Sequence, residues 1–303
     1  MESRHLEYFI AVAEELSFTR AAARTFAVQS TVSAAIRSLE HDFGATLFER
    51  STKRVALTPA GEQLLPRARV AVEAIDAARS SVALTEAGIR GRLRVGIFAS
   101  LDLLDLPSIF GDFHEKHPLV DLQLTASQSG STGFADDVRR GRVDVAFMGL
   151  PALDLPDIHS LTLTTTEFVA VLPHAHPLAA VPSVALAQIA GEAFVDTPPG
   201  FGNRVVFERA LAAEGLTRSV STVVSDLGEV PRFVAAGLGI AVVPLALLAH
   251  AEGAAIVPLA QRIEWTLSLI SRPNPSPATS ALLALMRERL GRSSSARPVS
   301  GGT

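Results

Sequence analysis

The chain has 303 residues, of which 48% are hydrophobic and 19% are charged, and it contains no cysteine. This length exceeds the usual size of one domain, and the apolar content is sufficient for buried cores, so a wholly disordered protein is excluded. The lack of cysteine excludes disulfides, a thiol nucleophile, a cysteine-ligated zinc site and a thiol redox sensor. The formal net charge of −4, taken over the whole chain, argues against a nucleic-acid partner.

The position of the charges weakens that argument. Residues 1–90 hold 11 basic and 11 acidic residues, whereas the remainder holds 16 basic and 20 acidic residues. Within residues 20–54, six cations stand against three acids, which gives a local charge of +3. The six cations are Arg20, Arg24, Arg37, Arg50, Lys53 and Arg54. The distribution indicates a modestly basic segment joined to an acidic remainder, and such a segment is compatible with DNA binding.

Three helices are expected in residues 1–43. The first has an apolar stripe at helical spacing, and the second follows Ser17, which is a suitable N-cap. The third covers residues 28–43 and ends at Gly44, a suitable C′ glycine. The expected core face of this third helix consists of Val32, Ile36, Leu39 and Phe43.

The opposite face of the third helix carries small and polar side chains. Gln29 can bind adenine through two hydrogen bonds, and Arg37 can pair with guanine or a phosphate. Ser30, Thr31 and Ser33 are short enough to let the backbone approach DNA closely. A short helix, a turn and a second helix of this kind favour a helix-turn-helix, although an ordinary solvated helix face has the same pattern.

A cationic hairpin follows and favours the DNA-binding alternative. Two short strands are expected, Thr46–Glu49 and Val55–Leu57, and three cations lie in the turn between them. These cations are Arg50, Lys53 and Arg54.

A long helix is expected from Pro59 to about Ala87. Its apolar residues recur at steps of four and three, which is the seam of a coiled coil. The seam consists of Leu64, Ala68, Ala71, Ile75, Ala78 and Val82. An identical chain is the simplest partner for this seam, and packing against the chain's own N-terminal helices is the alternative.

Gly88 and Gly91 mark a hinge, beyond which short apolar runs alternate with amphipathic helices. This alternation indicates parallel sheets covered by helices, in two small α/β lobes with a cleft between them. The expected strands are Leu93–Ala99, Val120–Ala126, Val143–Gly149, Glu167–Leu172, Ala193–Thr197, Val220–Ser225, Ile240–Pro244 and Trp265–Ser271.

Several motifs in the N-terminal segment occur together, in order and at regular spacing. They are Leu6-Glu7-Tyr8-Phe9, Ser17-Phe18-Thr19-Arg20-Ala21-Ala22, Gln29-Ser30-Thr31-Val32-Ser33, Ile36-Arg37-Ser38-Leu39-Glu40, Leu47-Phe48-Glu49-Arg50 and Leu57-Thr58-Pro59-Ala60-Gly61. This set resembles the winged helix-turn-helix of LysR-type transcriptional regulators, densely over residues 6–61 and more loosely through the rest of the chain. Val28 departs from the family pattern, in which a serine usually caps the recognition helix. Thr25 replaces a usual leucine, and Ala34 stands where arginine or lysine is frequent.

The resemblance implies an α/β fold with three parts. A winged helix-turn-helix is expected over residues 1–58 and a linker and dimerisation helix over 59–88. A two-lobed α/β effector domain of the periplasmic-binding-protein type is expected over 92–292. Its lobe I would cover about 92–162 and 269–292, and its lobe II about 163–268. The Ser/Gly/Pro-rich tail 293–303 is expected to be disordered.

The resemblance also assigns roles to residues on each side of the hinge. Gln29, Ser30, Ser33 and Ala34 would contact bases, with Ala34 offering only apolar contact, for instance to a thymine methyl. Arg50, Lys53 and Arg54 would form the wing at the DNA backbone or minor groove. In the second half, the family places a small-molecule effector in the cleft between the lobes.

The general rule that ligands lie beyond the carboxyl ends of strands selects the cleft residues. Hydroxyls, glycine N–H groups and phenylalanine walls there suit a small organic molecule with a polar or anionic end and an apolar body. Arg204 would supply a countercharge, or serve as an ordinary surface residue. The expected effector-binding residues are Phe98, Ser100, Ser129, Ser131, Met148, Gly149, Thr197, Gly200, Phe201, Gly202 and Arg204.

No catalytic or metal-binding constellation is found in the sequence. His114 and His117 share a helical face but have no third ligand nearby, and His174 and His176 lie in a loop where histidines usually face solvent. Phosphate-loop, dinucleotide and Gly-x-Ser-x-Gly motifs are missing. We expect a cytoplasmic regulator with no enzyme activity, no metal, no cofactor and no membrane span. Its partners would be double-stranded promoter or operator DNA, an unidentified effector, RNA polymerase and further copies of itself, as a dimer through the linker helix and a tetramer. A solute-binding module or enzyme with an incidental helical domain, or a cleft that binds nothing, are the alternatives.

Overall fold

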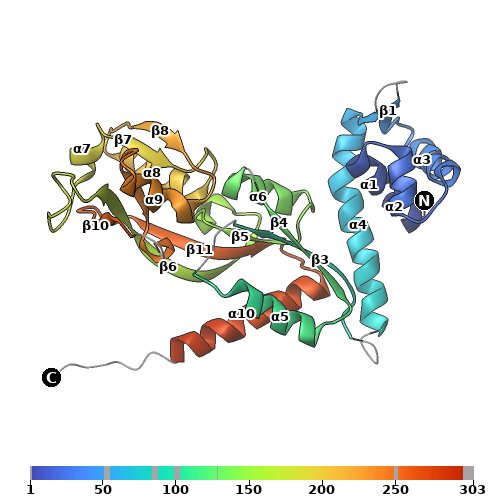
Figure 1. Ribbon diagram of the computed structural model, residues 1–303. Helices are drawn as coiled ribbons and strands as arrows, with labels where there is room; N and C mark the ends of the chain where they lie inside the picture. Colours follow the sequence, from blue (N-terminus) through green and yellow to red (C-terminus); the bar gives the residue numbers. More distant parts are fainter. Residues whose placement is uncertain are drawn as a thin grey trace. The chain divides into compact units, whose positions relative to one another are not determined.

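The structure, a computed structural model, describes residues 2–50, 55–83, 88–98, 103–127, 129–248 and 252–295 (Figure 1). Apart from the segment Arg139–Arg142, the chain divides at Gly91 into an N-terminal and a C-terminal compact unit. Each unit is described by itself. Among the described residues, no helix combines the length and the apolar character that a membrane span requires.

The N-terminal unit is a bundle of helices with a two-stranded hairpin. Its elements are α1 (Ser3–Glu15), α2 (Phe18–Arg24), α3 (Gln29–Phe43), β1 (Phe48–Arg50), β2 (Val55–Leu57) and α4 (Pro59–Ala83). The predicted caps are confirmed, because the Ser17 hydroxyl accepts the Arg20 N–H at 3.3 Å and Gly44 ends α3 with a φ of +62°. Phe9 and Phe48 meet in the core, with ring centroids 5.4 Å apart. The antiparallel pairing of β1 with β2 confirms the predicted hairpin, whose turn, residues 51–54, lies outside the described residues.

One residue of the predicted core face of α3 is placed differently. Val32, Ile36 and Leu39 are fully buried, but the Phe43 residue is 45% exposed. Phe43 is the last residue of α3, so no further helical turn continues the packed face beyond it. The prediction that Phe43 belongs to the core is therefore wrong.

The apolar residues of the predicted α4 seam pack differently in the two halves of the helix. In its first half, Ala68 is buried in the N-terminal core, and Leu64 and Ala71 pack against that core. Ala78, farther along the helix, is exposed. The alternative of packing against the chain's own helices therefore holds for the first half of α4, and the second half retains apolar positions that the unit's own core does not use.

The C-terminal unit contains one large mixed sheet and a smaller parallel pair. The elements up to residue 173 are β3 (Gly91–Ile97), α5 (Leu106–Lys116), β4 (Val120–Ala126), α6 (Gly130–Arg139), β5 (Val145–Met148), η1 (Ala152–Asp154) and β6 (His159–Pro173). The following ones are α7 (Leu186–Ile189), β7 (Ala193–Asp196), α8 (Gly202–Ala213), β8 (Ser219–Val223), η2 (Leu227–Glu229), α9 (Val230–Ala235), β9 (Ala241–Pro244), η3 (Leu245–Leu247), β10 (Ala254–Pro258), β11 (Glu264–Ser271) and α10 (Pro277–Ser295). The large sheet has the order β10-β6-β11-β5-β3-β4, with β9 also paired to β6, and β7 pairs with β8.

The expectation of parallel sheets is only partly correct. β3 pairs with β5, and β7 with β8, in parallel, but β6 runs antiparallel to β9, β10 and β11. The sequence predicted a strand over residues 167–172, whereas β6 has 15 residues. Its first half, from His159 to Thr166, is rich in threonine and lacks the apolar run that marked the second half. β10 was not predicted.

Aromatic packing fixes the position of α8 within this unit. The Phe207 ring lies against Phe168 of β6 and Phe194 of β7, with centroid distances of 6.3 and 5.9 Å. All three rings are buried. Because α8 is anchored through its middle, its first residues, Gly202 and Asn203, are held near the end of β5.

Candidate DNA-binding and effector sites

The first two turns of α3 present a polar, largely exposed surface. Gln29, Ser30, Thr31, Ala34 and Arg37 are all exposed. Ser30, Ala34 and Arg37 lie on the side of α3 opposite to its buried face. Gln29 and Thr31 lie beside that face and are exposed because they are in the first turn. This surface has the size and chemistry that a recognition helix presents to the major groove.

Ser33 was also predicted to contact DNA, but unlike the other predicted residues of α3 it is buried, with 8% of its surface exposed. The Gln29 side-chain amide donates a hydrogen bond to the Ser33 hydroxyl at 3.0 Å. In the described geometry Ser33 therefore orients Gln29 and is not itself presented on the exposed surface of α3.

The N-terminus of α3 has no side-chain cap. Val28 occupies the N-cap position, is 65% exposed and makes no capping hydrogen bond. The first N–H groups of a helix have no acceptor within the helix, and together with the helix dipole they form a site that favours anions such as DNA phosphates. Neither Gln29 nor Ser30 has replaced the missing cap.

The remaining predicted DNA contacts lie outside α3. Arg20 of α2 forms an ion pair with Glu15 at 3.3 Å, and its side chain is 65% exposed. Arg50 ends β1, and the structure describes its backbone only. Lys53 and Arg54 lie outside the described residues.

A pocket lies in the C-terminal unit between the ends of several elements. Phe98 follows β3, Ser131 is in the first turn of α6, and Gly149 follows β5. The complete lining is Phe98, Ser131, Gly149, Phe201, Gly202, Asn203, Ser225, Asp226, Leu227, Leu247 and Trp265. Segments far apart in the sequence thus converge on one small cavity.

Five of the predicted effector-binding residues line this pocket: Phe98, Ser131, Gly149, Phe201 and Gly202. Five others do not: Ser129, Met148, Thr197, Gly200 and Arg204. Ser100 lies outside the described residues.

Three of the predicted residues that do not line the pocket, Thr197, Gly200 and Arg204, make hydrogen bonds close to it. The Gly200 carbonyl accepts the Thr132 N–H at 3.1 Å, which links the loop before α8 to the start of α6. Arg204 donates to the Thr197 carbonyl at 2.9 Å and pairs with Glu208 at 2.7 Å. In the described geometry Arg204 supplies no countercharge to the pocket.

Six lining residues were not predicted. Ser225, Asp226 and Leu227 follow β8, so the strand-end rule that selected Ser131 and Gly149 would also have found them. Asn203 lies in the first turn of α8, immediately after predicted residues. Leu247 lies in η3, directly after β9, so the same rule would have found it. Trp265 lies near the start of β11, and no local signal marked it.

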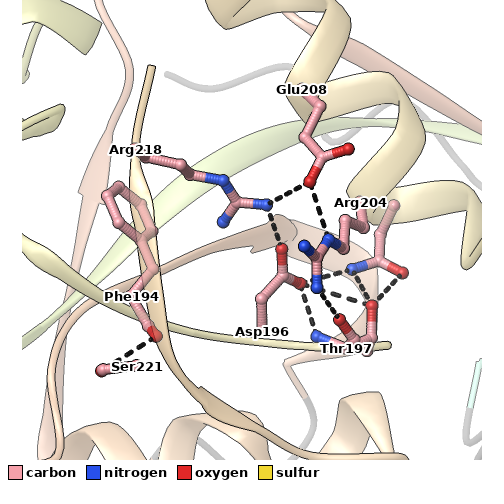
Figure 2. Close-up of polar contacts among 8 residues, drawn as sticks. Phe194, Asp196, Thr197, Arg204, Glu208, Arg218 and Ser221 are labelled. Carbon is pink, nitrogen blue, oxygen red and sulfur yellow. Dashed lines mark hydrogen bonds and ion pairs between the residues drawn. The ribbon is translucent and has the colours of Figure 1, made fainter. Parts of the chain in front are cut away.

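A buried polar network holds Asn203 in place. Figure 2 shows its members Asp196, Thr197 and Arg218. The Asn203 amide donates to Asp196 Oδ1 and to Thr197 Oγ1, in both cases at 3.1 Å. Asp196 also pairs with Arg218, whose guanidinium carbon lies over both the Phe194 and Phe207 rings, 4.9 and 4.8 Å from their centroids. The side chains of Asp196 and Arg218 are 2% and 4% exposed. One edge of the pocket is therefore supported by a charged pair in the core.

Across the described part of the chain, no group of three or more His, Asp or Glu side chains is placed to hold a metal ion. His176 accepts the Leu178 N–H through Nδ1 at 3.2 Å, and its Nε2 lies 3.6 Å from Glu192. These contacts give His176 a local structural role.

Comparison with known families supports both halves of the chain. Residues 3–62 match the family described as "Bacterial regulatory helix-turn-helix protein, lysR family", and residues 86–291 match the "LysR substrate binding domain". The regulator ShiR of Corynebacterium glutamicum (strain R) is 39% identical over 246 residues, which span 80% of this chain and 82% of ShiR. The dual regulator GltC of Bacillus subtilis (strain 168) is 31% identical over 93% of this chain and 94% of its own length.

Solved structures have the same fold. A full-length variant of OxyR from Pseudomonas aeruginosa has a TM-score of 0.73 at 24% identity, covering 96% of this chain and 94% of OxyR. CbnR bound to its target DNA has a TM-score of 0.58 at 24% identity, covering 95% of this chain and 99% of CbnR. The family matches and the relatives together establish that the chain belongs to the LysR-type transcriptional regulators, with a DNA-binding helix-turn-helix and an effector-binding domain, and is not an enzyme.

Proposed function

We propose that the chain controls transcription by reading promoter or operator DNA with α3, and that a small organic effector in the pocket of the C-terminal unit alters this binding. The observation that carries the DNA-binding part is the exposed polar face of α3 beside an uncapped helix N-terminus. Side chains on this face would contact bases, and the free N–H groups would contact a phosphate.

We assign base contacts to Gln29, Arg37 and Ala34, with Ser30 and Thr31 allowing close approach. Ser33 acts by orienting Gln29, to which it is hydrogen-bonded. Arg50, Lys53 and Arg54 would reach the DNA backbone or minor groove from the hairpin. Arg20 would add a phosphate contact, because an exposed pair such as the one with Glu15 restrains its side chain only weakly.

The oligomer we propose is a homodimer through α4, paired into a tetramer by the effector domains. Support comes from the second half of α4, where Ile75 is half-buried and Ala78 is exposed on the apolar seam. A two-fold dimer with two recognition helices binds two related half-sites in inverted orientation. Occupancy of the pocket would shift the population between two arrangements of this oligomer, provided that the effector binds them with different affinity.

The signal in this proposal is a bound molecule and not thiol oxidation, because the chain has no cysteine. The effector would lie among Phe98, Ser131, Gly149, Phe201 and Gly202. Ser100, which is outside the described residues, stays a proposed contact from the sequence. We propose an indirect role, in positioning the lining residues, for the predicted residues that do not line the pocket: Ser129, Met148, Thr197, Gly200 and Arg204. We further propose a cytoplasmic location, where the target DNA is, and contact with RNA polymerase at the regulated promoter. We propose the domain limits expected from the sequence, except that α10 reaches Ser295, inside the tail expected to be disordered over 293–303.

A gel shift with the DNA upstream of the chain's own gene tests the DNA-reading surface. The wild-type chain should form a complex that unlabelled specific DNA displaces, and Arg37→Ala should weaken it by about tenfold to a hundredfold, as expected for loss of a base contact. Arg262→Ala, which removes a 73% exposed side chain in the C-terminal unit, is the matched control and should bind like wild type. Absence of any sequence-specific complex at every salt concentration would contradict the proposal.

A further inference from the structure

The indole nitrogen of Trp265 is a buried donor without an acceptor. Trp265 lines the pocket and is 2% exposed. Within the described part of the chain, its Nε1–H has no hydrogen-bond partner. A buried donor that lacks an acceptor costs free energy, so its position in a pocket points to an acceptor supplied by a ligand.

Gly149 lies directly beside this buried donor. A Cβ built on Gly149 would lie 2.8 Å from Trp265 Nε1, so any side chain at this position would cover the indole edge. The Gly149 N–H donates to the Ser131 hydroxyl oxygen at 3.2 Å. Because that oxygen already accepts a hydrogen bond, the hydroxyl hydrogen of Ser131 can be donated to a second oxygen in the pocket.

The start of α8 adds backbone donors at the same place. This helix has 12 residues, and its N-cap residue, Phe201, provides no side-chain cap for the first N–H groups. Its first two residues, Gly202 and Asn203, line the pocket, and Gly202 approaches the backbone of Gly149 closely. The Trp265 indole, the Ser131 hydroxyl and the first N–H groups of α8 therefore form one donor cluster around Gly149.

We propose that the effector presents an sp² oxygen, as a carboxylate or a carbonyl, to this donor cluster, and that Trp265 determines specificity by donating its Nε1–H to that oxygen. The inference rests on the proposed effector pocket and names the class of ligand. The apolar body of the effector would contact Phe98, Phe201, Leu227 and Leu247. Asp226 is the charged residue of the described lining, which contains no arginine or lysine, so the test compares a carboxylate with a neutral carbonyl.

The test uses the full chain and three probes, which are phenylacetate, phenylacetamide and toluene. Trp265 is the chain's single tryptophan, so ¹⁵N labelling of the indole gives one signal from the proposed donor. Phenylacetate or phenylacetamide should bind saturably and move the indole proton signal downfield, whereas toluene, which lacks an acceptor, should not move it in this way. A preference for phenylacetate identifies a carboxylate effector, and a preference for phenylacetamide identifies a neutral carbonyl.

Variants then separate the hydrogen bond from packing. Trp265→Phe should lower the affinity for the preferred oxygenated probe by about tenfold, which is the contribution of one hydrogen bond. Calorimetry measures this affinity. Toluene affinity should change little in this variant and is the internal control for ring packing. Ser131→Ala should cause a loss of similar size and serves if Trp265→Phe does not fold.

Three results would overturn the inference: neither oxygenated probe binds, the bound probe leaves the indole signal in place, or both variants bind it as wild type does. These failures are distinguishable from failure of the proposed function. If the chain still binds the upstream DNA but the indole proton signal does not move with either oxygenated probe, only the proposed ligand class is contradicted. Loss of specific DNA binding would contradict the proposed function itself.

Discussion

Gly202, at the start of α8, lies so close to Gly149, after β5, that a Cβ on Gly202 would come within 2.5 Å of the Gly149 carbonyl oxygen. The clash would be with backbone atoms, so no side-chain rotation could relieve it. Both glycines line the pocket, and their close approach holds two of its walls together. The absence of a side chain at position 202 is therefore a condition for this geometry.

Gly202→Ala is expected to destabilise the C-terminal unit by about 1–3 kcal/mol, the usual range for overpacking a close contact. The measurement is thermal unfolding followed by the fluorescence of Trp265. Gly191→Ala is the matched control, because Gly191 is exposed and a Cβ there would meet nothing within 4 Å. Equal unfolding midpoints for the two variants would show that a side chain at position 202 fits beside Gly149 without cost, which contradicts the prediction.

Arg218→Met is expected to lower the free energy of unfolding by about 3–5 kcal/mol, because it leaves the buried Asp196 carboxylate without its countercharge. Urea denaturation gives the free energy of unfolding. Arg209→Ala is the control, since its pair with Asp154 involves a side chain that is 56% exposed and should contribute less than about 1 kcal/mol. The double variant Asp196→Asn/Arg218→Met should recover much of the loss. A double variant no more stable than Arg218→Met would refute the charge-based explanation.

Glu14 makes the stability of the N-terminal unit depend on pH. Burial alone would raise the pKa of this carboxyl, but hydrogen bonds and charge from Arg69 and Arg24 outweigh it and lower the pKa below its ordinary value of 4.5. Glu14 Oε1 lies 2.8 Å from the buried Arg69 guanidinium. A carboxyl whose pKa is lower in the folded state stabilises the fold above pH 4.5, and this contribution is lost as the pH falls through the folded-state pKa.

Glu14→Gln is therefore expected to lower the free energy of unfolding by about 1–2 kcal/mol at pH 7, measured by circular dichroism during denaturation. The difference from wild type should shrink as the pH falls below 4.5. Glu115→Gln removes an exposed carboxylate of α5 and should change stability by less than about 0.5 kcal/mol. A difference between Glu14→Gln and wild type that stays constant down to the lowest pH at which the chain folds would contradict this account.

Val28→Ser should stabilise α3 by about 1 kcal/mol relative to Val28→Ala, because a serine hydroxyl at the N-cap can accept an N–H of the first turn. Thermal unfolding of the two variants measures the effect. The comparison with alanine removes the contribution of the exposed valine side chain. Equal stability of the serine and alanine variants would mean that the N-terminus of α3 is already satisfied.

The N-terminal unit was largely predictable because its signals are local. The cap at Ser17, the left-handed Gly44 and the buried face of α3 each follow from residues within one or two helical turns. Ser33 was placed on the exposed side from helical spacing alone. Its burial depends on packing in the folded unit, which the spacing does not contain.

The pocket was predictable only where it obeys the strand-end rule. Ser131, Gly149 and Gly202 lie at helix starts or after a strand, and the rule selects such positions. Trp265 lies near the beginning of β11, and the antiparallel pairing of β11 with β5 and β6 brings it to the same place. The pairing of Asp196 with Arg218 likewise depends on the parallel pairing of β7 with β8. Such contacts follow from sheet topology, which no local pattern in this sequence specifies.

The most direct test of the central claim is selection of bound sequences from a random pool of double-stranded DNA by the full chain. The account predicts enrichment of one motif with two inverted half-sites, and a changed base preference within each half-site for Arg37→Ala but not for Arg262→Ala. Enrichment of no motif, or the same motif for wild type and Arg37→Ala, would contradict sequence reading by α3.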